Sequence, residues 1–414
     1  MLDARTNGAV ALVYVLATIA MAFTAWSYAE MSAAIPHAGS VFAYVTEGIG
    51  PRAGFLAGWM AMLDYLLIPS VAYLFSGIAL HALVPAIPAW AFTIAAFAIT
   101  TSLNLAGVGV AARAGFVVLA AEIAMLAAFV VSAIVVLAVH GPARPWSAPL
   151  AGMGDVRVGT IAGGVSIAVL SYLGFDAIAS FAEESSGDSR QVGSAIFFCL
   201  AAAGVLFVAQ SYLAAVLSPI DPAALAARPA AQGTAFYDLT RQAIGPPLAT
   251  ALAATKAIGP AFAAMAGQAA AARLLFGMAR DGGLPRALAT IDRRRGVPRA
   301  ALLSAGALTL VVAVWAARRD DGLDMLVSIV DVGALAAFTL LHASVVGYFL
   351  VMRKGAARAA HGIVPLAGAA ITVSVLAAAS AAATRAGIVW LAAGVITALY
   401  RAPRSSRYTC PTDR

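Results

Sequence analysis

SYLGFDAIASFAEES, residues 171–185, places Gly174 and Asp176 in the middle of an apolar segment. A glycine lets the backbone leave helical geometry, and a carboxylate in lipid is costly unless it faces a cavity or has a partner. Irregular backbone at membrane depth is tolerated only where protein or a water-filled cavity covers it. Broken helices that present main-chain groups to a solute are a recurring feature of secondary transporters. This stretch therefore indicates a membrane transporter.

The composition of the chain indicates a polytopic membrane protein. Its 414 residues are 62% hydrophobic and 11% charged, with a mean hydropathy of +0.91, whereas soluble domains have about 25% charged residues. The two cysteines, Cys199 and Cys410, form no disulfide framework and have no metal-ligand spacing. The net charge of +7 is explained by basic loops, because no basic patch is interleaved with aromatic residues. We therefore expect no nucleic-acid partner and no metal.

Apolar runs long enough to cross a bilayer, about 20 residues each, recur along the chain. They lie near 8–32, 54–81, 88–107, 113–139, 158–183, 192–218, 246–272, 299–317, 322–351, 362–383 and 386–400. No cleavable signal peptide is evident, because the first run continues into WSYAEM without a small-residue cleavage site. Most loop arginines fall on one side when these spans alternate, so the positive-inside rule predicts an external N-terminus and a cytoplasmic C-terminus.

Four motifs follow one another in a characteristic order. They are SYAEMSAAIPHAGSVFAYV (27–45), GFLAGWMAMLDYLLIPS (54–70), SYLGFDAIASFAEES (171–185) and RLLFGMARDGGLPRAL (273–288). Together they resemble the amino acid–polyamine–organocation permease superfamily, and most closely its putrescine and amino acid importers. The second motif is similar to the third helix of that family, the third to its broken sixth helix, and the fourth to the loop after its eighth.

The resemblance implies an all-α fold of two inverted five-helix repeats and two further helices. If the first span corresponds to the second helix of the family, the eleven spans are helices 2–12. Residues 1–402 then form one transporter domain, with an incomplete first repeat at 8–139, a second repeat at 158–351 and additional helices at 362–400. Residues 403–414 are a cytoplasmic tail. The family's first helix, which supplies backbone N–H groups for a substrate carboxylate, is not in this sequence. Either the start was set downstream of the true one, or the chain is a truncation.

Asp64 and Tyr65 lie about ten residues into a span, near mid-membrane depth. A carboxylate there costs about 2.5–3.5 kcal/mol on insertion scales and should have a partner. One interpretation is a counter-charge for a substrate ammonium, with the Tyr65 hydroxyl or ring adding a hydrogen bond or a cation–π contact. The alternative is that Asp64 bonds to a neighbouring helix and only fixes packing.

The break in the third motif is the second candidate site. Leu173, Gly174 and Phe175 are the expected unwound point, with Ser171 before it. Carbonyl groups freed there could accept hydrogen bonds from an amine, and Phe175 could close over the substrate. An ordinary glycine kink is the alternative. Asp176 either caps the following half-helix or contacts the substrate.

Three further ionisable residues within spans are candidates for energy coupling, namely Glu122, Lys256 and Asp331. Glu122 replaces the lysine found near this position in many proton-coupled relatives, so it either carries a proton itself or forms a structural bridge. Lys256 is a lone cation that should pair or lose its proton, with Asp64, Asp176 or Asp331 as candidate partners. Such a pairing would favour a neutral amino acid over a diamine.

The acidic pair Glu183 and Glu184 sits at the end of the broken helix and is a candidate for an inner gate; a solvated face is the simpler alternative. The basic loop 280–299 is explained by contact with anionic lipid, at about 1 kcal/mol per charge.

The sequence thus predicts a secondary transporter of the inner membrane, moving an amino acid or a polyamine such as putrescine by alternating access. A transport-inactive truncated permease, or a membrane sensor or relic, is the alternative. Intramembrane enzymes are disfavoured, because there is no H-E-x-x-H, G-x-S-x-G or Cys–His motif, and no filter signature indicates a channel. We expect no cofactor, a proton gradient or a counter-substrate as the energy source, lipid as the surroundings and no obligate protein partner.

Overall fold

The computed structural model describes residues 2–35, 40–154, 156–184, 190–228, 232, 234–292, 294–319, 322–353, 356–377 and 381–400. Within these residues, eleven helical segments are long and apolar enough to cross a membrane. The expected all-α, polytopic architecture with eleven spans is therefore confirmed.

The long helices follow the apolar runs of the sequence. They are α2 (Val10–Ala34), α4 (Pro51–Leu83), α5 (Ala89–Ala106), α6 (Val108–His140), α8 (Val158–Leu170), α9 (Arg190–Leu217), α13 (Pro246–Arg280), α14 (Arg299–Ala316), α15 (Gly322–Val345), α16 (Ala360–Ala377) and α17 (Ala381–Tyr400). Two of them continue in another helical form: α8 leads to the 3-10 helix η1 (Phe175–Glu184), and α15 to the π-helix η3 (Val346–Val351). Shorter helices are α1 (Leu2–Arg5), α3 (Val41–Gly48), α7 (Ala148–Ala151), α10 (Pro222–Ala226), α12 (Ala235–Ala243) and η2 (Arg286–Ala289).

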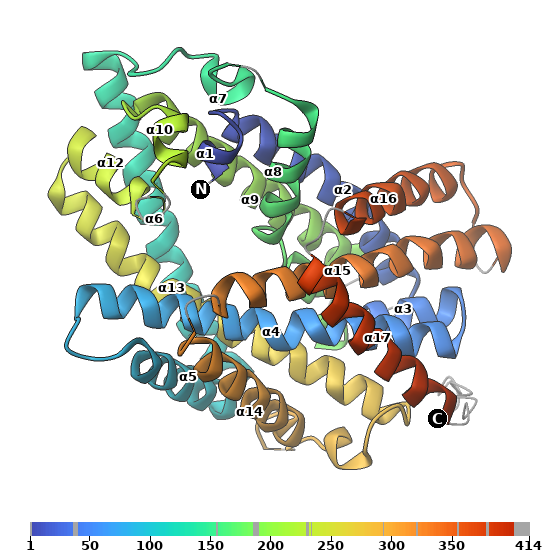
Figure 1. Cartoon of the computed structure of the whole chain (residues 1–414). Helices are drawn as coiled ribbons and strands as arrows, with labels where there is room; N and C mark the ends of the chain where they lie inside the picture. Colours follow the sequence, from blue (N-terminus) through green and yellow to red (C-terminus); the bar gives the residue numbers. More distant parts are fainter. Residues whose placement is uncertain are drawn as a thin grey trace.

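Helix α4 lies at the centre of the bundle. It contacts α3, α5, α13, α14, α15 and α17, and Figure 1 shows it running beside α13 through the lower half of the molecule. Small residues allow this approach, since a Cβ at Gly58 would lie 3.0 Å from Met278 Sδ of α13. Because α4 is enclosed on several sides, polar residues in its middle are withdrawn from lipid.

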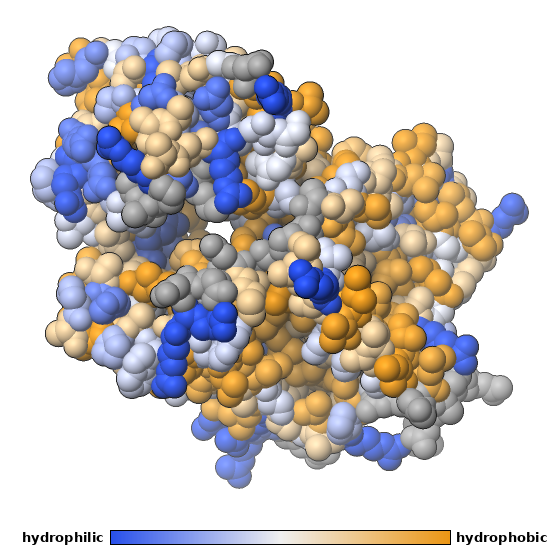
Figure 2. All heavy atoms as spheres, viewed as in Figure 1, coloured by the Kyte–Doolittle hydropathy of each residue, from blue (hydrophilic) through white to orange (hydrophobic). Residues whose placement is uncertain are grey.

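The surface divides into apolar and polar regions. Orange, apolar residues cover α15, α16 and α17, whereas hydrophilic residues gather over α7, α10 and α12 at the upper left of Figure 2. This division is typical of a helical bundle whose sides face lipid and whose ends face water.

Two tryptophans, 331 residues apart in sequence, tie α17 to α4. The indole N–H of Trp59 donates to the carbonyl of Trp390 at 2.8 Å, and the indole N–H of Trp390 donates to the carbonyl of Trp59 at 2.7 Å. Their rings stack with centroids 4.8 Å apart. The single N–H donor of each indole is thereby paired, as an apolar environment requires.

Replacing Trp59 with Phe is expected to lower the stability of the detergent-solubilised protein by about 1 kcal/mol, because the N–H···O bond from the Trp59 indole to the Trp390 carbonyl is lost. The measurement is the thermal melting midpoint. Trp90→Phe is the matched control, since Trp90 is 39% exposed. Equal shifts of the melting midpoint in the two variants would show that the bond between the Trp59 indole and the Trp390 carbonyl does not contribute this stability.

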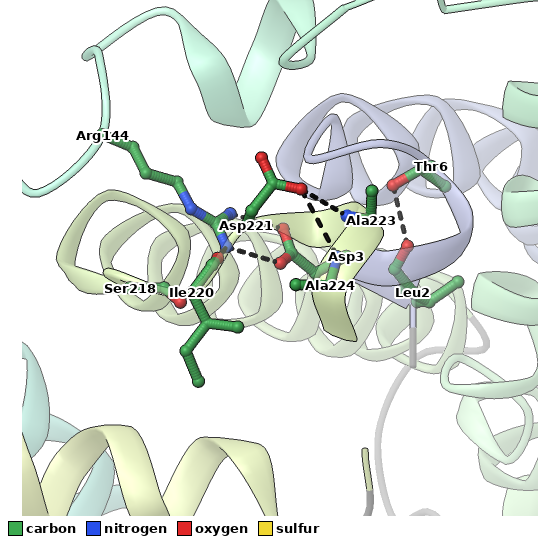
Figure 3. A network of polar contacts seen from close by, with 9 residues as sticks. All are labelled: Leu2, Asp3, Thr6, Arg144, Ser218, Ile220, Asp221, Ala223 and Ala224. Carbon is green, nitrogen blue, oxygen red and sulfur yellow. Dashed lines mark hydrogen bonds and ion pairs between the residues drawn. The ribbon is translucent and has the colours of Figure 1, made fainter. Parts of the chain in front are cut away.

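A second tie holds the N-terminal segment (Figure 3). The Arg144 guanidinium donates to both carboxylate oxygens of Asp3, at 3.0 and 3.1 Å, and to Ser218 Oγ at 3.1 Å. It also donates to the Ile220 carbonyl. The Arg144 side chain is 2% exposed and that of Asp3 is 20% exposed. One side chain thus joins α1, the segment after α6 and the turn between α9 and α10.

Candidate functional site

The two candidate residues of α4 are both buried in the centre of the bundle: Asp64 is 2% exposed and Tyr65 is 4% exposed. Helix α15 comes very close at this level, because a Cβ on Gly333 would lie 2.5 Å from Leu63 Cβ and 2.9 Å from the Met60 carbonyl oxygen. Any larger residue at position 333 would push α15 away from the turn of α4 that carries Asp64.

The chain leaves α-helical geometry where the sequence indicates a break. Helix α8 ends at Leu170, Gly174 has a φ of +111°, and the 3-10 helix η1 begins at Phe175. That φ lies in the region that L-residues with side chains rarely adopt. Gly174 therefore turns the chain so that Phe175 and Asp176 face the interior, where they are 4% and 2% exposed.

Asp176 is held by three hydrogen bonds. The Tyr65 hydroxyl donates to its Oδ2 at 2.7 Å, and the Tyr28 hydroxyl of α2 donates to the same oxygen at 3.4 Å. The backbone N–H of Gly174 donates to Oδ1 at 3.2 Å. These contacts join α2, α4 and η1 at one carboxylate, so Tyr65 points at Asp176.

Asp64 has a different environment from Asp176. Its strongest charge–charge interactions are with two other carboxylates, Asp176 and Asp331 of α15. Its Oδ1 is buried without a hydrogen-bond partner among the described residues, and so is Oδ1 of Asp331. Two unpaired carboxylate oxygens and one fully bonded carboxylate thus meet at the centre of the bundle. Such a cluster is costly in an apolar enclosure unless a cation or protons neutralise it.

Aromatic rings enclose one side of this cluster. The ring of Tyr28 is edge-on to Phe175, Phe338 and Tyr44 at centroid distances of 6.3, 5.9 and 6.1 Å. Phe175 and Phe338 lie 6.2 Å apart. Sequence reasoning did not select Tyr28, Tyr44 or Phe338; the first two lie in the motif at 27–45, and Phe338 carries no signal of its own.

Glu122 and Lys256 lie apart from the aspartate cluster and interact with each other. Glu122 packs on Gly259 of α13, where an added Cβ would overlap its Oε1. Lys256 is exposed and lines a cavity shared with Ser171 and Tyr14. Among the described residues, Lys256 therefore acts electrostatically on Glu122, and its pairing with Asp64, Asp176 or Asp331 stays a prediction.

The remaining candidates lie along the broken helix. Ser171 is exposed and Leu173 is half-buried, before the turn at Gly174. Glu183 and Glu184 are the last residues of η1, and their side chains lie outside the described residues. Among the residues described, no group of three or more His, Cys, Asp or Glu has an arrangement that could hold a metal ion.

Eleven apolar helices, one of them broken beside a buried acidic cluster, define a multi-pass membrane protein of the transporter class. Residues 3–400 match the model of the family described as amino acid permease. The chain belongs to this family, within the amino acid–polyamine–organocation superfamily, as its motifs indicate. Members of this family are transporters and not enzymes.

Several characterised permeases are similar to the chain. The low-affinity putrescine importer PlaP of Escherichia coli (strain K12) is 30% identical over 84% of this chain and 75% of its own length. The branched-chain amino acid permease BcaP of Lactococcus lactis subsp. cremoris is 27% identical, over 83% of this chain and 74% of its own. A methylthioribose transporter of Bacillus subtilis is 28% identical, over 85% and 75%. A small amine or amino acid substrate is consistent with these relatives.

Proposed function

We propose that the chain is a secondary transporter that imports or exchanges a small amine across the inner membrane by alternating access. The first candidate substrate is a polyamine such as putrescine. The observation that carries the proposal is the central cluster of Asp64, Asp176 and Asp331. A cationic substrate would neutralise charges that the described protein leaves without a partner. The putrescine importer among the relatives supports the same substrate class.

In this proposal Asp64 accepts the substrate ammonium, and Tyr65 holds Asp176 and adds an aromatic face. The carbonyl groups between Ser171 and Gly174 supply further acceptors. Phe175 is the gate, because it belongs to the aromatic wall around Tyr28.

Asp331 takes a second positive charge in this scheme, since its Oδ1 is unpaired beside Asp64. Two unpaired acids favour a substrate with two ammonium groups, a diamine. An amino acid with one ammonium group is the second candidate substrate. The neighbouring pair Glu122 and Lys256 is the candidate for proton coupling. A proton gradient or a counter-substrate would supply the energy.

The same proposal extends to topology. The membrane domain would consist of a first repeat at 8–139, a second repeat at 158–351 and additional helices at 362–400. The C-terminus would lie in the cytoplasm. The gate at Glu183 and Glu184 would then lie on the cytoplasmic side.

The deciding experiment is uptake of labelled putrescine into proteoliposomes that contain the purified protein. We expect uptake above protein-free liposomes, stimulated by an inward proton gradient or by preloaded unlabelled putrescine. Unlabelled diamines should compete better than lysine, and lysine better than leucine.

Competition by leucine alone would move the assignment to a neutral amino acid. No uptake with binding of an amine retained would favour the transport-inactive alternative, whereas neither uptake nor binding of any amine would remove amines as the substrate class. Binding measured by equilibrium dialysis separates these two outcomes, because an inactive carrier can still bind its ligand.

A further inference from the structure

A groove between α4, α14, α15 and α17 lies on the other side of α4 from Asp176. Its floor includes Leu63 and Leu67 of α4, and its walls include Val311 of α14, Leu326 of α15 and Val389 of α17. Nearly all of its lining is apolar. The groove is therefore separate from the aspartate cluster, although Leu63 is the neighbour of Asp64.

The groove opens sideways onto the surface that faces lipid. Val311 is 66% exposed and Val389 is 70% exposed. Apolar residues cover α17 in Figure 2. A hollow of this kind in the side of a bundle is accessible from the bilayer and not from water.

One end of the groove carries positive charge. Arg385, near the beginning of α17, lines it, and its one hydrogen bond to the described residues joins Nε to the Ala381 carbonyl at 3.2 Å. The Arg319 guanidinium lies 5.1 Å from the ring centroid of Trp315, which also lines the groove. Arginine and tryptophan together are typical of the membrane–water interface, so this end lies at headgroup level.

The length of the groove matches one leaflet. The rise of α17 from Arg385 to Ala393, the last lining residue on that helix, is about 12 Å at 1.5 Å per residue. The hydrocarbon core of a leaflet is about 15 Å deep. A molecule with its polar end at Arg385 and an apolar chain along α17 would fill the groove over most of this depth.

We propose that this groove binds an anionic phospholipid of the bilayer. Its phosphate contacts Arg385, and one acyl chain lies against Val311, Leu326 and Val389. Guanidinium groups match phosphate oxygens with paired N–H donors. The described residues that line the groove include no carboxylate that could receive the ammonium of a zwitterionic headgroup. The acyl chain would also rest on Leu63 and so support the turn of α4 that carries Asp64.

The test is native mass spectrometry of the purified protein with phosphatidylglycerol or phosphatidylcholine added at equal concentration. We expect the wild type to retain phosphatidylglycerol over phosphatidylcholine by about fivefold, which corresponds to about 1 kcal/mol for the one arginine at the phosphate. Arg385→Gln should bring the ratio close to one. Ala386→Phe, which fills the groove without changing a charge, should lower retention of both lipids.

Arg157→Gln is the matched control, because Arg157 is exposed, precedes α8 and lies on the same side of the membrane when the spans alternate. It should keep the preference. The same preference for phosphatidylglycerol in Arg385→Gln and the wild type would overturn the proposal. Equal retention of both lipids by the wild type would also overturn it, because the groove would then hold only the surrounding bulk lipid. Thermal stabilisation by phosphatidylglycerol, lost in Arg385→Gln alone, is the second readout.

Discussion

Replacing Asp64 with Asn is expected to reduce amine uptake by at least about thirtyfold, the effect of removing one member of a buried, hydrogen-bonded charge pair worth 2 kcal/mol or more. Asparagine keeps the size of the side chain and removes the charge that would bind the ammonium. The measurement is initial uptake of labelled putrescine into proteoliposomes at equal protein density.

Stability provides the control within the same variant. Because Asp64 Oδ1 has no hydrogen-bond partner among the described residues, an amide in its place relieves a buried charge, and the melting temperature should not fall. A loss of uptake without a loss of stability thus indicates binding rather than folding.

Asp221→Asn is the matched control for charge. Asp221 accepts the backbone N–H of Ala223 at 2.8 Å as the cap of α10, and asparagine caps helices equally well. Uptake should be unchanged. Unaltered uptake of every cationic and zwitterionic amine by Asp64→Asn would remove Asp64 from the proposed site.

Replacing Arg144 with Gln is expected to lower the free energy of unfolding by about 3 kcal/mol, the lower end of the range for breaking a buried ion pair. The lower end applies because Asp3 keeps some contact with solvent, whereas the Arg144 side chain is almost fully buried. Glutamine cannot reach both oxygens of Asp3 and leaves that carboxylate without its cation. The measurement is the thermal or denaturant unfolding midpoint in detergent.

A double-mutant cycle identifies the cause. Asp3→Asn combined with Arg144→Gln should be less destabilised than the sum of the single variants, because removing the second partner leaves no unpaired charge. Arg228→Gln, at an exposed position, should leave stability near the wild-type value. Additive effects of the two single replacements would contradict a direct pair.

Much of the fold could be predicted because apolar length and glycine position are local signals. Eleven runs became eleven spans, and Gly174 lies at the break. The predicted end of the seventh run, at 272, falls short of Arg280, because Arg273 interrupts the apolar run while the helix continues through the mostly apolar residues 274–279.

Contacts between distant segments could not be predicted in the same way. The direction in which Lys256 points depends on the rotation of α13 against α6, which packing sets and composition does not, so Glu122 was not among the partners expected for Lys256 from the sequence. The reciprocal bonds of Trp59 and Trp390 join residues 331 positions apart. Phe338 belongs to the aromatic wall only because α15 crosses α2 and η1 at that level.

The form of η1 has a mechanical consequence for the acidic cluster. A 3-10 helix has poorer hydrogen-bond geometry than an α-helix, so its backbone can be deformed at a lower cost than that of the helices beside it. Asp64 belongs to an α-helix of 33 residues enclosed by its neighbours, whereas Asp176 belongs to η1. The cluster is therefore built from one stiff element and one compliant element, and a change of spacing between these two carboxylates would be taken up mainly by the segment that begins at Phe175.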